Sequence, residues 1–194
     1  MTFYNIIFGI LFLEAIHELF VSIVERNRLK FFMALSLAIC VVNDTLYTSH
    51  YIEKDAKVYN VKMKLLDLLN FFVLGISLFI LSPRHNVFYS SDIPGVTICK
   101  PPACCFWGLL VIYWILAYCW NRLAESERAP KTNIQESPWP FRLIVIVTLL
   151  AFFASLTPWP SLQLYTSIYC AVTLLTYMTI HKLMKERGEK KRRG

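Results

Sequence analysis

Glycine is scarce in this chain of 194 residues, and its shortage removes several classes of function. The six glycines form neither a Gly-rich loop that could cradle a phosphate nor the Gly-x-Ser-x-Gly turn that presents a nucleophilic serine. They also form no Gly-xxx-Gly pair, the pattern that lets two membrane helices approach closely. We therefore expect neither an enzyme nor a cofactor.

Charged residues are also few, at 17% of the chain, whereas 56% of the residues are hydrophobic. A soluble domain of this length could not cover so much apolar surface, and the mean hydropathy of +0.48 indicates a lipid environment. Long apolar windows alternate with short basic segments, which is typical of a polytopic membrane protein. Because the apolar runs are continuous, strands are not expected. We predict an all-α, polytopic transmembrane helical bundle without a separate soluble domain.

Six apolar windows approach the roughly 20 residues that a helix needs to cross a bilayer. The first begins without a basic segment or a following cleavage site, so we expect a retained helix and not a signal peptide. The fourth and fifth windows are short for a full crossing, which leaves four or five spans as the alternative. The predicted domains are 1–181, transmembrane, and 182–194, a basic tail. The windows are 3–24, 31–52, 65–82, 103–120, 141–157 and 162–181.

Seven Lys and Arg residues follow the last window, and such an excess of basic residues beside a span predicts that the tail lies in the cytoplasm. Six spans then put the N-terminus inside as well, so that fusions at residues 60 and 128 should also report a cytoplasmic location. A basic cluster at 26–30 breaks this rule and leaves open a five-span model with the N-terminus outside. We predict that the tail docks a cytosolic partner or anionic lipid and does not bind nucleic acid directly. Its basic residues are Lys182, Lys185, Arg187, Lys190, Lys191, Arg192 and Arg193.

Ionisable and amide side chains interrupt the first three windows. Within the first window they are spaced i, i+3 and i+4, so they share one side of a helix. Lipid cannot satisfy such groups, and we predict that the patches face other helices and fix their packing. This intramembrane polar cluster comprises Glu14, His17, Glu18, Asn43, Asp44, Asp67 and Asn70.

Two other interpretations of the cluster deserve comparison. A proton or cation pathway through Glu14, Asp44 and Asp67 is the main alternative. A metal site is not expected, because the Glu-x-x-His pattern of di-iron bundles occurs once at Glu14 and His17, and the second histidine of a zinc protease helix is missing.

Cysteine and tryptophan suggest two further features. Cys99, Cys104 and Cys105 lie in or beside the predicted outer connection, where a disulfide from Cys99 to either of the others competes with free thiols. The five tryptophans fall mainly near the ends of the windows, which predicts positions at the membrane interface. They are Trp107, Trp114, Trp120, Trp139 and Trp159.

These features lead to a functional hypothesis without a family resemblance. A chain with neither an active-site motif nor a soluble domain must act through contacts, so we expect a membrane sensor or scaffold subunit, homo-oligomeric, with a cytosolic protein partner. Its predicted place is the cell membrane, with a bacterial inner membrane favoured over a eukaryotic endomembrane, in a setting such as antiviral defence or a stress response. The alternative is a small ion channel or proton-coupled transporter that uses the acidic cluster.

Overall fold

The computed structural model describes residues 3–54, 60–82, 102–127 and 139–193, and beyond Thr179 it describes the backbone alone. The described residues form helices and short connections, with no strand among them, so the prediction of an all-α bundle is confirmed. Each predicted window overlaps one helix, and the window 3–24 has the bounds of the first. The helices are α1 (Phe3–Val24), α2 (Arg28–Lys54), α3 (Val61–Leu81), α4 (Pro102–Glu127), α5 (Trp139–Ser155) and α6 (Pro160–Arg193).

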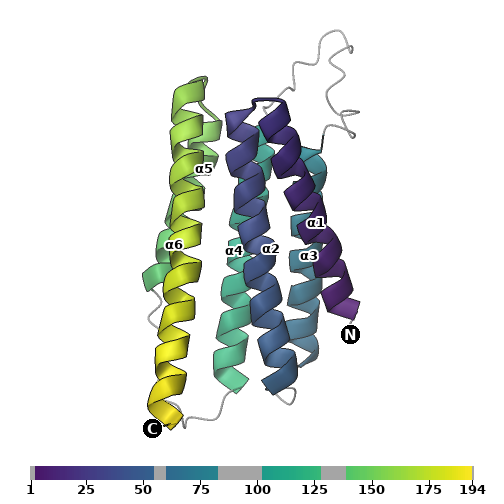
Figure 1. Ribbon diagram of the computed structural model, residues 1–194, viewed down its shortest axis with the longest axis vertical. Helices are drawn as coiled ribbons and strands as arrows, with labels where there is room; N and C mark the ends of the chain where they lie inside the picture. The colour runs from purple at the N-terminus through teal and green to yellow at the C-terminus, as the bar shows by residue number, and fades with distance from the viewer. Residues whose placement is uncertain (1–2, 55–59, 83–101, 128–138, 194) are drawn as a thin grey trace.

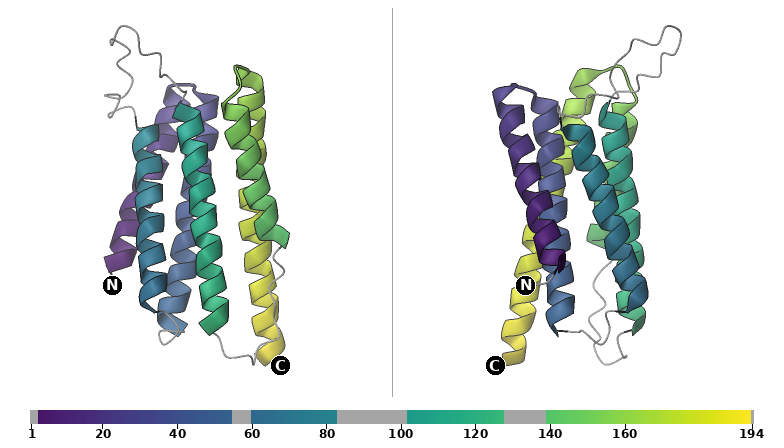
Figure 2. Two further views of the ribbon diagram at one scale, coloured as in Figure 1. Left: turned by 180° about the vertical axis from the view of Figure 1, so that it is seen from behind. Right: turned by 90° about the vertical axis from the view of Figure 1, so that its right-hand side faces the viewer.

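Consecutive helices run in opposite directions, side by side along one long axis (Figure 1). Helix α2 packs against α1, α3 and α6, while α4 packs against α3 and α5, and α5 against α6. Helix α1 packs on α2 and α3 at the outer edge of the bundle (Figure 2). We call the end at which α1 joins α2 the hairpin end, and the opposite end, where α6 terminates, the tail end.

Four helices contain segments that are long and apolar enough to cross a membrane. Helix α5 adds a shorter apolar segment, Phe141–Ser155. Large apolar side chains also cover the outside of the bundle: Leu13, Phe72 and Phe153 are 68%, 62% and 59% exposed. Since soluble monomers rarely expose contiguous apolar patches of such extent, this exterior is suited to contact with lipid. The four segments are Ile6–Val24, Arg28–Leu46, Val61–Leu81 and Ala103–Ala124.

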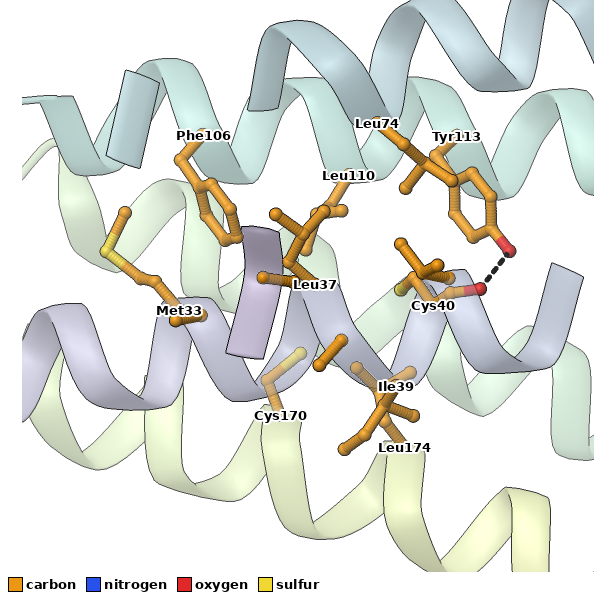
Figure 3. Packing of buried hydrophobic residues seen from close by; sticks show 14 of the residues in the cluster. Met33, Leu37, Ile39, Cys40, Leu74, Phe106, Leu110, Tyr113, Cys170 and Leu174 are labelled. Carbon is orange, nitrogen blue, oxygen red and sulfur yellow. Dashed lines mark hydrogen bonds between the residues drawn. The ribbon is translucent and has the colours of Figure 1, made fainter. Parts of the chain in front are cut away.

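The middle of the bundle is an apolar core. Leu37 of α2, Leu74 of α3 and Leu110 of α4 are at most 1% exposed and interdigitate there (Figure 3). A hydrogen bond crosses this core, from the hydroxyl of Tyr113 on α4 to the backbone carbonyl of Cys40 on α2, at 3.2 Å. The core therefore separates the polar residues of the hairpin end from those of the tail end.

The connection between α1 and α2 is a tight hairpin with a cap on each helix. Arg26 has a φ of 54°, in the left-handed region, and the amides of Arg26 and Asn27 donate to the carbonyls of Ile23 and Ser22. This is the Schellman pattern that closes a helix C-terminus, with arginine in the position that usually holds glycine. The Oδ1 of Asn27 then accepts a hydrogen bond from the amide of Lys30 at 3.0 Å and caps α2. The hairpin brings the start of α2 beside the last turns of α1.

Candidate functional site

The three ionisable residues of α1 lie in different surroundings. Glu18 is 2% exposed and faces the bundle, whereas Glu14 is exposed and the side chain of His17 is 47% exposed. Positions 14, 17 and 18 cover about 100° of a helix, and a helix at the edge of a bundle buries only part of its circumference. Within one chain, therefore, only Glu18 meets other helices as predicted.

Glu18 belongs to an ion cluster at the hairpin end. Its Oε2 lies 3.1 Å from the Nζ of Lys30, which in turn donates a hydrogen bond to Oε2 of Glu25 at 3.1 Å. The geometry between Glu18 and Lys30 is that of an ion pair, since Oε2 of Glu18 makes no hydrogen bond within the described residues. The Nδ1 of His17 lies 3.7 Å from Oε1 of Glu18. We call Glu18, Glu25 and Lys30 the hairpin ion cluster.

This cluster gives Lys30 a structural role. The side chain of Lys30 is 11% exposed and lies against the buried carboxylate of Glu18, which would otherwise be a lone charge in the bundle. Lys30 comes from the basic cluster at 26–30 that breaks the predicted charge asymmetry. The packing of α1 on α2 therefore explains a basic residue at position 30, whatever the orientation of the chain in the membrane.

The polar residues predicted on the second and third windows meet at the tail end. They line a cavity of about 20 Å³, which is enough for one water molecule. Helices α4, α5 and α6 complete its walls, and α1 contributes no lining residue. We call it the tail-side pocket. Its lining residues are Asn43, Asp44, Asp67, Asn70, Trp114, Ala117, Trp120, Asn121, Phe141 and Tyr177.

The tail-side pocket concentrates buried polar groups. Asp44, Asp67 and Asn70 are 7%, 1% and 1% exposed. Oδ2 of Asp44, Oδ1 of Asn70 and Nε1 of Trp114 make no hydrogen bond within the described residues. A buried polar group without a partner costs about 1–3 kcal/mol, and in native proteins ordered water is a common partner of such groups. Two acceptors and one donor around a space of this size suit a water-sized species that both accepts and donates hydrogen bonds.

The aromatic walls of the pocket were not predicted from the sequence. Trp107, Trp114 and Trp120 are 1%, 2% and 5% exposed and so lie inside the bundle, while Trp159 is 65% exposed; their depth at the membrane interface stays a prediction. Most buried residues recur along α4 at intervals of three or four, and this spacing could have identified an inward-facing stripe. The buried residues are Ala103, Cys104, Phe106, Trp107, Leu110, Tyr113, Trp114, Trp120 and Ala124.

Two other predicted features have a limited description. Cys99 lies outside the described residues, so its disulfide with Cys104 or Cys105 stays a prediction; Cys104 is buried and Cys105 exposed in the first turn of α4. Within the described ranges, no group of three His, Cys, Asp or Glu side chains is placed to hold a metal ion.

Helix α6 connects the tail-side pocket with the basic tail. It is continuous from Pro160 to Arg193, and it carries Tyr177 of the pocket wall. Lys182, the first basic residue of the tail, follows five residues later, which corresponds to about 7.5 Å along a helix. The backbone of the predicted tail is thus an extension of a bundle helix.

Comparisons of this chain with protein-family models, with curated proteins and with solved structures found no match. The functional argument therefore depends on the two polar clusters and on α6.

Proposed function

We propose that the protein is a membrane-embedded sensor or scaffold subunit that acts on a cytosolic protein partner through its basic tail. One observation carries this proposal: α6 forms part of the pocket wall at Tyr177 and continues without interruption into the tail. A change of hydrogen bonding in the pocket would shift the lower part of α6, and a continuous helix would pass that shift to the tail. The subunit acts as a homo-oligomer.

The setting that we propose is a bacterial inner membrane and a defence or stress-response system. The four helices that are long and apolar enough to cross a bilayer support the membrane part of this setting. The basic tail, attracted to anionic lipid when it has no partner, would then be exchanged between the membrane surface and the partner.

The test is a quantitative pull-down from solubilised membranes with the full chain. Truncation after Met184 should leave the bundle intact and strongly reduce recovery of a stoichiometric cytosolic partner. The pair Asp44→Asn and Asp67→Asn should reduce recovery although it leaves the tail unchanged. Ser77→Ala serves as the control, because Ser77 is a buried polar residue of α3 outside the pocket, bonded to the carbonyl of Val73 in its own helix. Full recovery with the truncated chain would show that the tail is only an orientation signal.

A proton- or cation-coupled carrier is the second candidate, favoured by the presence of Asp44 and Asp67 in one cavity. The route predicted through Glu14, Asp44 and Asp67 does not run inside one chain, because Glu14 lies on the outer side of α1 and does not line the pocket. Flux of protons or Na⁺ into proteoliposomes should then be abolished by Asp44→Asn and retained by Glu14→Gln. Absence of flux above that of empty liposomes would eliminate this candidate.

A further inference from the structure

The outer side of α1 exposes an acid and a base near the middle of the membrane. Glu14 lies within the apolar segment Ile6–Val24, at least about 12 Å along the helix from either end, which is farther than a glutamate side chain extends. Both Glu14 and His17 are exposed, on a helix that stands at the edge of the bundle in two different views (Figures 1 and 2). Lipid tails supply no hydrogen-bond partner, so this side of α1 requires another protein surface.

The two residues are arranged so that the surface complements itself. Glu14 and His17 are about 60° apart around the helix, and Ile10, which is 56% exposed, projects between them. Consider two parallel α1 helices that are related by a two-fold axis along the membrane normal. A residue to the left of the contact line on one helix then faces the residue to the right of the contact line on the other helix. Each Glu14 then lies beside the partner's His17, one helical turn away, with the two Ile10 side chains in the centre.

We propose that a second copy of this chain covers this surface, and that two reciprocal Glu14–His17 pairs hold the two α1 helices together. The proposal specifies the homo-oligomer of the proposed function. A different membrane protein would have to supply both a base and an acid at matching depths, whereas a second copy supplies both by symmetry. His17 is suited to the pairing because its Nδ1 lies toward Glu18 of its own chain, at 3.7 Å, which leaves Nε2 for the carboxylate of the partner.

Reciprocal exchange of the two charges provides the test. Glu14→His leaves two bases on the surface and His17→Glu leaves two acids, so each variant alone should dimerise about tenfold more weakly than the original chain. A mixture of the two variants should form mixed dimers at the original strength. The measurement is energy transfer between two differently labelled batches of full-length protein in liposomes, over a range of protein-to-lipid ratios.

Glu25→Gln is the matched control, because it removes an exposed carboxylate from the hairpin and not from the proposed interface; it should dimerise like the original chain. The milder variants Glu14→Gln and His17→Gln, each with an expected loss of about tenfold, keep the test decisive if the exchanged variants do not insert. An original chain that is monomeric at every ratio, mixed dimers no stronger than those of each variant alone, or unchanged dimerisation of Glu14→Gln would overturn the proposal. The liposomes contain no cytosolic partner, so failure here is distinct from failure of tail docking.

Discussion

The hairpin ion cluster and the tail-side pocket both hold buried carboxylates, but they differ in what surrounds them. In the hairpin ion cluster, Lys30 lies 3.1 Å from a carboxylate oxygen of both Glu18 and Glu25. In the tail-side pocket, two aspartates share one cavity, and none of the described residues that line it is basic. The carboxylate of Glu18 thus has a cation within its own helical hairpin, whereas the described lining of the tail-side pocket offers the two aspartates no basic residue.

On our proposal, this difference separates a structural role from a functional one. A buried ion pair that joins two consecutive helices compensates the charge of Glu18 once the hairpin forms, which favours a structural role. A pocket that brings two carboxylates together without a basic residue in its described lining can hold a small polar species, which favours a functional role. We test this distinction by the free energy of unfolding of four variants, measured in mixed micelles with increasing dodecyl sulfate.

The largest effect is expected from Lys30→Met. Removing the lysine leaves Glu18, 2% exposed, as a buried charge without its cation, and such losses amount to about 3–5 kcal/mol. The double variant Glu18→Leu with Lys30→Met should recover most of that stability, since it removes both charges together. Glu25→Gln should cost less than about 1 kcal/mol, because the side chain of Glu25 is 42% exposed. If Lys30→Met unfolds at the same detergent fraction as the original chain, the hairpin ion cluster has no structural role.

A smaller effect, about 1 kcal/mol, is expected from Tyr113→Phe. This variant removes the hydroxyl that donates to the carbonyl of Cys40 and that also interacts with Asn43 and Asp44 of the tail-side pocket. It measures what this buried hydroxyl contributes at the border between the apolar core and the pocket. Tyr118→Phe is the control, because Tyr118 is 42% exposed and its hydroxyl accepts a hydrogen bond from Arg122 on the surface. Equal losses for both variants would contradict the role assigned to the core hydrogen bond.

Hydropathy predicts the helices of this chain better than it predicts their ends. The window 3–24 coincides with α1, whereas α4 extends to Glu127, beyond the window that ends at 120, and α6 extends to Arg193. Hydropathy detects where lipid begins and ends, but a helix continues through polar residues that favour it, such as those of the segment "NRLAESE".

The polar cluster could be predicted only in part. Asp44 and Asp67 lie in consecutive apolar windows, which predicts that the two side chains face each other, and both line the tail-side pocket. It does not reveal Lys30 as the partner of Glu18, since that contact depends on the tight hairpin at Arg26. Nor does it show that α1 is peripheral and exposes Glu14, which is decided by the packing of all six helices.

The hairpin itself offers a variant that should increase stability, by about 0.5–1 kcal/mol. Arg26 has a φ of 54°, which is unfavourable for a residue with a Cβ atom, and Arg26→Gly relieves this strain. Arg26→Ala is the control, because it removes the same charge but keeps a Cβ atom. Gain with glycine and none with alanine would attribute the effect to the backbone. Equal stability of the two variants would mean that the left-handed conformation carries no cost here.

The smallest change in stability, less than about 0.5 kcal/mol, is expected from Asp44→Asn. Asparagine has nearly the same shape as aspartate, and Oδ2 of Asp44 makes no hydrogen bond within the described residues that the exchange would break. If the pocket is a functional site, this variant should nevertheless strongly reduce recovery of the cytosolic partner, whereas Lys30→Met should mainly reduce stability. Unfolding and pull-down measured on the same preparation decide the point. A loss of several kcal/mol with Asp44→Asn would place the tail-side pocket in the same structural class as the hairpin ion cluster, because its carboxylate would then hold helices together as Glu18 does.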